Sequence, residues 1–144
     1  MADVGIKSLG DRAITNALTS EVITSAVSPG GVAQEFVSGL DGMTALSLQA
    51  NFTYGSGGTT CVVLVETSLD TVNWITIARF DFTTASSLKI ANLSGLLSKA
   101  IAAASVLIAE GVTDGFLGDR LRATVTSTGT YAGNTSVSVR AAVR

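Results

Sequence analysis

The side chains that most enzymes use for acid–base and nucleophilic chemistry are scarce in this sequence. It contains no histidine, so it cannot hold a Ser-His-Asp or Cys-His arrangement, and the commonest general base is missing. Cys61 is the sole cysteine, which excludes an intrachain disulfide and a thiolate metal cage. The glycines form neither a dinucleotide-binding motif nor a phosphate loop, since residues 55–58 join two strands. We therefore expect no catalysis, no cofactor and no metal site.

Paired carboxylates are the one remaining route to catalysis, because two of them can cleave glycosides. The eleven acidic residues are spread singly along the chain, and nothing in the sequence brings two of them together. A carboxylate-based glycosidase is therefore the weakest hypothesis.

The densest charged stretch runs from Asp114 to Arg122. Arginine offers planar, bidentate pairing, so the stretch could be a contact surface that uses Asp119, Arg120 and Arg122. The alternative is a turn held by a local ion pair from Asp119 to Arg120 or Arg122. We favour the turn.

Trp74 is the only tryptophan and has two interpretations. Its aromatic face could be a stacking platform for a sugar, or its ring could belong to the core. Most of the aromatic residues are in phase with core positions, and we therefore favour the core.

Alternation of apolar and polar residues with a period of two is the main structural signal. It predicts strands at residues 46–54, 60–68, 74–84, 120–126 and 135–143, and shorter strands at 32–38 and 88–93. Predicted helices do not alternate with predicted strands along the chain, which argues against a parallel α/β sheet. We expect an all-β protein, built as an antiparallel, jelly-roll-like β-sandwich.

The strand at 60–68 is apolar on both faces, with Val63 and Val65 on one side and Val62 and Leu64 on the other. Such a strand is central in its sheet, or one of its faces meets a neighbouring subunit. The candidate interface residues are Val63, Val65, Trp74, Arg79, Asp119, Arg120 and Arg122.

Two segments break the strand pattern. Between residues 93 and 108 the apolar side chains recur at helical spacing, which predicts one short helix packed on the sandwich. Residues 1–30 suit a helix or a strand, and Pro29-Gly30-Gly31 reads as a hinge. We expect residues 1–30 to be an N-terminal arm and residues 31–144 to be the β-sandwich domain.

The composition indicates assembly rather than electrostatic binding. Only 14% of the residues are charged, and the mean hydropathy is +0.48, so a free monomer would expose much apolar surface. We expect an obligate homo-oligomer, since such interfaces are more apolar than free surfaces. The net charge of −2 argues against a nucleic-acid partner.

The ends and the longest apolar stretch bear on location. The first residues have no basic segment followed by an apolar run, so we expect cytoplasmic synthesis without a secretory signal. The longest apolar stretch, residues 96–109, is shorter than the roughly 20 residues that cross a bilayer, and no membrane partner is expected.

Two stretches of the sequence carry recognisable motifs. Residues 67–84 contain a predicted hairpin of the form S-x-D-x-x-x-W-x-x-I-x-x-F-x-F, and the second stretch is residues 111–122, continued through 128–135 to the end. The first resembles a hairpin of small β-sandwich proteins from tailed-bacteriophage virions, and the second resembles the C-terminal part of the same group. Together the two stretches cover about half of the chain. The group is similar to capsid decoration or cement proteins.

The resemblance implies a protein on the outer capsid surface of the virion, made in the host cytoplasm. It implies a homotrimer that binds the major capsid protein and holds neighbouring capsomers together. The alternative is a tail, neck or fibre module that binds another virion protein, or a host glycan through Trp74 and Tyr131.

Overall fold

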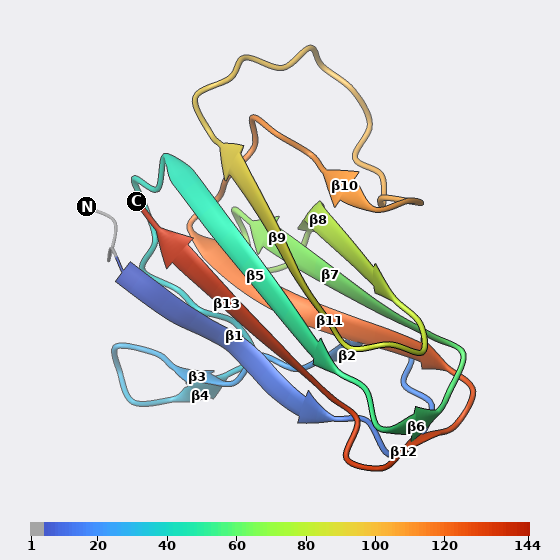
Figure 1. Cartoon of the computed structure of the whole chain (residues 1–144). Helices are drawn as coiled ribbons and strands as arrows, with labels where there is room; N and C mark the ends of the chain where they lie inside the picture. The colour runs from blue at the N-terminus through green and yellow to red at the C-terminus, as the bar shows by residue number, and fades with distance from the viewer. Residues whose placement is uncertain (1–4) are drawn as a thin grey trace.

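Two antiparallel β-sheets lie face to face in the computed structural model, which describes residues 5–144 (Figure 1). Sheet A contains, in spatial order, β1 (Gly5–Ala13), β13 (Ser136–Val143), β5 (Ala45–Thr53) and β9 (Ser87–Ser94). Sheet B contains β10 (Gly111–Val112), β8 (Trp74–Phe82), β7 (Thr60–Ser68), β11 (Arg120–Thr128) and β2 (Glu21–Val22). Two short ribbons pair β3 (Ala26–Val27) with β4 (Ala33–Gln34), and β6 (Ser56–Gly57) with β12 (Tyr131–Ala132). The expected all-β, antiparallel architecture is confirmed, and it is consistent with a β-sandwich.

The chain passes repeatedly from one sheet to the other. Among β1, β2, β5, β7, β8, β9, β11 and β13, only the β7–β8 hairpin joins two neighbours within one sheet. Every other step in chain order changes sheet, so strands distant in sequence lie side by side. The first strand, β1, pairs with the last, β13.

The core lies between the sheets because inward and outward residues alternate along each strand. In β5, Leu46, Leu48 and Phe52 are buried while Ser47 and Gln49 are exposed. The same alternation in the other long strands completes the core with Cys61, Val63, Val65, Phe80, Phe82, Leu121, Ala123, Val125, Val137, Val139, Ala141 and Val143. Burial in this apolar core raises the pKa of the Cys61 thiol to about 12, so the thiol stays protonated at neutral pH.

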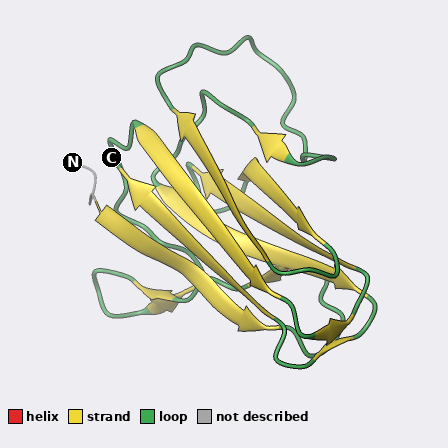
Figure 2. Ribbon diagram, in the orientation of Figure 1, coloured by secondary structure: helices red, strands yellow, loops and turns green. Residues whose placement is uncertain are grey.

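The predicted helix between residues 93 and 108 is wrong. β9 ends at Ser94, and residues 95–110 form a loop without helix or strand (Figure 2). A short helix is only marginally stable in water unless its apolar face packs on something. In the single chain much of this face stays in water, since Ile101 is 105% exposed and Ile108 is 92% exposed.

The structure places the described part of the expected N-terminal arm inside the sandwich. Residues 5–27 include β1, β2 and β3, and the side chains of Leu9, Ile14 and Leu18 are buried in the core. Residues 1–4 of the arm lie outside the described residues. The predicted hinge at 29–31 is a hairpin turn between β3 and β4, closed by the Ser28 amide, which donates to the Val32 carbonyl at 2.8 Å.

Four aromatic rings, those of Phe52, Tyr54, Phe82 and Tyr131, lie together at one end of the sandwich. Phe52 stacks on Phe82 with the ring centroids 5.0 Å apart, and Tyr131 meets Phe52 edge-on at 5.8 Å. The Tyr131 hydroxyl donates to the Thr83 carbonyl oxygen at 2.7 Å. Gly58 lies directly against the Tyr131 ring at a φ of +69°, so a Cβ at this position would overlap the ring.

We expect Gly58→Ala to destabilise the fold more than Gly31→Ala. Both glycines have positive φ, which costs an alanine about 1–2 kcal/mol, but nothing lies within 4 Å of a Cβ at Gly31. Displacing the Tyr131 ring adds about 1–3 kcal/mol at Gly58. Urea unfolding of the two variants measures the difference, and equal losses would contradict this packing.

Candidate functional site

Val63 and Val65, two of the predicted interface residues, are part of the core. Both are 0% exposed and point between the sheets. The outward side chains of β7 are Val62 and Leu64, which are half-buried. A partner that touches this strand would therefore meet Val62 and Leu64, whereas a charge at Val63 or Val65 would disrupt the core itself.

The other predicted interface residues lie on or beside sheet B, and each arginine has a carboxylate partner. Arg79 pairs with Asp81 at 2.8 Å, and Arg120 lies 3.1 Å from Asp119. The pair of Asp119 and Arg120 is the local ion pair that the turn interpretation predicts. Its Asp119 Oδ1 and Arg120 Nη1 atoms are close without the alignment of a hydrogen bond.

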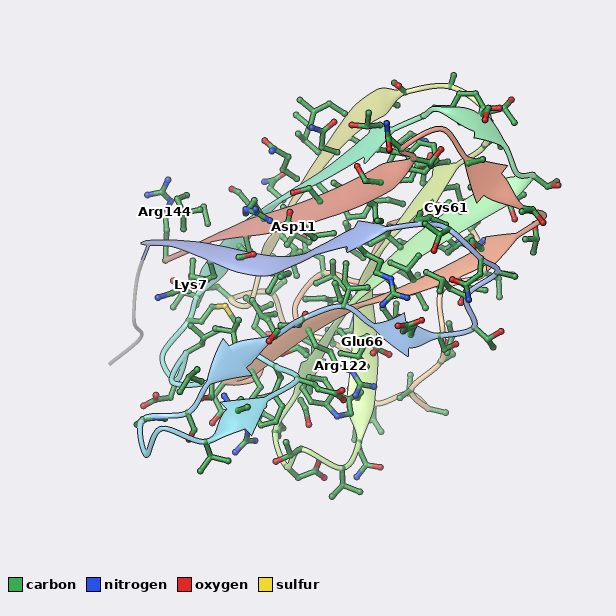
Figure 3. All side chains as sticks on the ribbon, turned by 90° about the horizontal axis from the view of Figure 1, so that it is seen from below. Lys7, Asp11, Cys61, Glu66, Arg122 and Arg144 are labelled. Carbon is green, nitrogen blue, oxygen red and sulfur yellow. The ribbon has the colours of Figure 1, made fainter. Side chains whose placement is uncertain are left out.

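Arg122 forms a pair that sequence reasoning missed. Its Nε donates to Glu66 Oε1 at 2.8 Å, because Glu66 and Arg122 are directly opposite each other on β7 and β11. Figure 3 shows the two side chains beside each other. Their side chains are 12% and 24% exposed, so the pair is largely shielded from water.

Trp74 is half-buried and outside the core, so the favoured interpretation is wrong, and its ring is not a free platform either. The Arg122 guanidinium lies over its ring at 4.2 Å from the centroid, and the Phe36 ring is 5.8 Å away. Tyr131, the other proposed platform, is 1% exposed. It lies beyond the opposite end of β7, so the two rings do not form one sugar-binding surface.

The motif residues around the β7–β8 turn have structural roles. The Asp70 carboxylate accepts hydrogen bonds from the amides of Val72 and Asn73, at 2.9 and 2.7 Å, and from the Asn73 side chain. These bonds hold the pKa of the Asp70 carboxyl well below its usual range. The Ser68 hydroxyl donates to the Asn73 carbonyl, and together the two side chains close the turn.

The stretch from Asp114 to Arg122 also ties elements together. Asp114 accepts from the Ser94 amide at 2.6 Å, and the Gly118 amide donates to Thr67 Oγ1 at 2.9 Å. These contacts join the end of β9 to sheet B. They explain the density of polar residues here without a ligand.

The loop at residues 95–110 is the most apolar exposed part of the described chain. Its exposed large side chains are Leu96 (76%), Leu97 (55%), Ile101 (105%), Val106 (60%) and Ile108 (92%). The sequence pattern places all of these except Val106 at helical spacing, and it predicted a helix packed on the sandwich. We call this segment the apolar loop.

The end of the apolar loop is anchored to the sandwich. Arg79 Nη1 donates to the Leu107 carbonyl at 3.0 Å, and Glu110 accepts from the Asp81 amide and from Lys89. The hydrogen bond from Lys89 keeps the pKa of the Glu110 carboxyl below its usual value. The loop is therefore held at its base while its apolar side chains face outward.

The outer face of sheet A carries a shallow hollow of about 490 Å³. Small side chains of β13 and β5, Ala142 and Ser47, lie opposite each other in the middle. Ile6 on β1 and Ile90 on β9 border them, and these two are 73% and 76% exposed. We call this surface the sheet A hollow.

The sheet A hollow is nearly neutral. Its Arg140 is paired with Asp11 at 3.0 Å, and the hydrogen bonds from Arg140 and Ser138 lower the pKa of the Asp11 carboxyl. Sequence reasoning missed Ile6 and Ile90, because only the pairing of β1 with β13 and of β9 with β5 brings them to one surface.

Residues 5–144 hold no group of three or more acidic or cysteine side chains placed to bind a metal ion. They also contain no helix that is long and apolar enough to span a membrane. What the surfaces offer is apolar contact, in the apolar loop and in the sheet A hollow.

We expect Arg122→Ala to cost about 1–3 kcal/mol of unfolding free energy, because it leaves the shielded Glu66 carboxylate without its partner. The matched control is Arg140→Ala, whose partner Asp11 has a side chain that is 63% exposed, and its loss should stay below about 1 kcal/mol. Urea unfolding followed by Trp74 fluorescence gives both values. Equal losses of unfolding free energy in the two variants would show that burial of the Glu66–Arg122 pair adds nothing to its contribution to stability.

Comparison of the chain with protein-family models, with curated proteins and with solved structures found no match.

Proposed function

We propose that this protein is a structural component of a tailed-phage virion that decorates the outer surface of the capsid. In this proposal it forms a homo-oligomer, a trimer by the resemblance, and binds the major capsid protein through non-covalent contacts. It carries out no chemical step. Binding to many equivalent lattice sites stabilises the head by mass action.

The observation that carries the proposal is the exposed apolar surface of the single chain. Soluble monomers rarely expose contiguous apolar patches larger than a few hundred Å². Here five large aliphatic side chains are exposed within the apolar loop alone, and Ile6, Leu88 and Ile90 are exposed on sheet A. Such surfaces are expected where a chain is covered by other copies or by a lattice.

The strand order adds support at the level of the fold. We interpret the eight strands that alternate between the two sheets as a jelly roll, with only the β7–β8 step inside one sheet. Jelly rolls occur in viral capsid domains and also in lectins. Because a fold does not specify a function, this support is by analogy.

The alternative proposal is a tail, neck or fibre module that binds another virion protein or a host glycan. The same apolar surfaces would serve contact with another virion protein. The glycan version depended on Trp74 and Tyr131. It is weakened because Arg122 lies over the Trp74 ring and Tyr131 is buried.

We expect the purified protein to be a stable trimer of the 14.6 kDa chain at micromolar concentration. The physical reason is that assembly removes the exposed aliphatic side chains from water. Light scattering coupled to size-exclusion chromatography measures the mass. A monodisperse monomer would contradict self-assembly.

We further expect density for the protein on the outside of the head when particles of the encoding phage are imaged. Particles that lack the protein should lose DNA at a lower temperature and should recover when the wild-type protein is added back. Density at the neck, tail or fibre would favour the alternative proposal. Equal heat stability with and without the protein would contradict a cement role.

A further inference from the structure

We propose that the apolar loop of one subunit folds into an amphipathic helix on the sheet A hollow of a second copy. Each subunit gives its loop to one neighbour and receives a loop from another, which closes a ring. This inference rests on the proposed self-assembly and names the two surfaces that perform it.

The first argument is a conflict between the loop's sequence and its conformation. Leu93, Leu96, Leu97, Ala100, Ile101, Ala104, Leu107 and Ile108 recur at helical spacing, yet residues 95–110 contain no helix. A helix of this length needs packing of its apolar face. A second chain supplies the packing that the single chain lacks.

The second argument is that the loop does not cover the hollow of its own chain. The residues that border the hollow come from β1, β13, β5 and β9, and none lies between 95 and 110. Figure 1 shows the loop leaving the end of β9 and reaching beyond the sheet before it returns to β10. Loop and hollow are therefore separate surfaces of one molecule.

The dimensions of the two surfaces agree. A helix over residues 96–109 would be about 21 Å long. The eight- or nine-residue strands of sheet A are about 26–30 Å long. The small Ala142 and Ser47 side chains leave room for a helix between Ile6 and Ile90.

The buried area requires that each subunit make two such contacts. In a helix over residues 96–109 the exposed Leu96, Leu97, Ile101 and Ile108 share one face, while Val106 points away from it. Each large aliphatic side chain covers about 60–120 Å², so these four bury about 240–480 Å². Counting both partners, one contact reaches about 480–960 Å², which is below the usual size of a stable interface. Two contacts for each subunit, one with the loop that it gives and one with the loop that it receives, bring the total to about 960–1,920 Å².

A reciprocal pair of subunits would also make two contacts. The proposed trimer selects the ring instead, in which the contact is heterologous because each subunit gives its loop to one neighbour and receives a loop from another. Heterologous contacts generate closed rings when the rotation between subunits closes, and filaments when it does not. A trimeric ring would therefore use one contact type three times.

The low positive charge of the apolar loop favours a second copy of the chain, rather than a membrane, as the partner that covers the loop. Helices that lie on membranes are rich in lysine and arginine on their polar face. The loop contains only Lys99 as a basic residue, and its Glu110 is held by Lys89 at the base. The sheet A hollow is nearly neutral as well, so two copies do not repel each other there.

The test uses cysteine pairs on the full chain. Ile101→Cys in the loop is mixed with Ile90→Cys in the hollow, and a short bis-maleimide reagent is added. Cys61 does not interfere, because it is 0% exposed. We expect crosslinked dimers from this mixture. Val72→Cys, at an 80% exposed position in the β7–β8 turn, replaces Ile90→Cys in the control and should give none.

A second variant tests the role of the loop without chemical crosslinking. Ile101→Asp should convert the oligomer into a folded 14.6 kDa monomer, with Val72→Asp as the matched control that still assembles. Far-ultraviolet circular dichroism should show helix in the wild-type oligomer that is absent from the Ile101→Asp monomer. Trp74 fluorescence reports whether the variant remains folded.

Several results would overturn this inference. If Ile101→Asp assembles like the wild type, the apolar loop is not the interface, although self-assembly itself still stands. A helical loop in a monomeric protein would mean that the loop closes on its own chain, over the cavity of about 420 Å³ beside Ile75 and Phe116. Binding of the wild type, but not of Ile101→Asp, to phosphatidylglycerol vesicles would assign the loop to a membrane. A monomeric wild type would instead contradict the proposed function as well.

Discussion

Burial of two apolar sheet faces against each other is the constraint on which the rest of this molecule depends. The chain has few charged residues, and its long strands alternate inward apolar with outward polar side chains. Because almost every connection changes sheet, neither face can be buried until strands from both ends of the chain have met. The pairing of β1 with β13 is the clearest case, since it joins the first and last described strands.

That burial leaves two outer faces with different chemistry. On sheet B, Glu66 and Arg122 pair in a shielded position, and the Arg122 guanidinium covers the Trp74 ring. The charged side chains of Glu66 and Arg122 on sheet B therefore have their partners within the same chain. Sheet A instead presents small and aliphatic side chains around a hollow, and the apolar loop projects nearby from the end of β9. The exposed surfaces best suited to contacts between molecules are therefore the apolar ones.

The residues that carry the resemblance to phage virion proteins act mainly on the fold. Ser68 and Asp70 close the β7–β8 turn, and Asp114 and Gly118 tie the region after the apolar loop to its neighbours. Motifs of this kind indicate a fold more directly than they indicate a function. The step from architecture to a place on the virion depends on surfaces that such motifs do not include.

The sequence by itself determined the fold class and most of the strands. The predicted strand at 60–68 coincides with β7, and the strands predicted in the regions of β5, β8, β9, β11 and β13 differ from them only at their ends, because period-two alternation is a local signal. The long strand β1 lies in the segment that was expected to be an arm. It also determined that Asp119 and Arg120 could pair, since they are neighbours in the chain. The choice between the two faces of β7 was not local, and Val63 and Val65 proved to be the inward pair.

Only the tertiary structure decided the remaining features, because each depends on residues far apart in the sequence. Glu66 meets Arg122 through the register of β7 with β11, and Ile6 and Ile90 share a surface through the order of four strands. In the apolar loop the local sequence pattern predicts a helix, and the structure of the single chain does not contain it. Its helical periodicity is a property of the sequence, but a helix forms only where a surface receives its apolar face, and in the single chain Ile101 and Ile108 stay exposed.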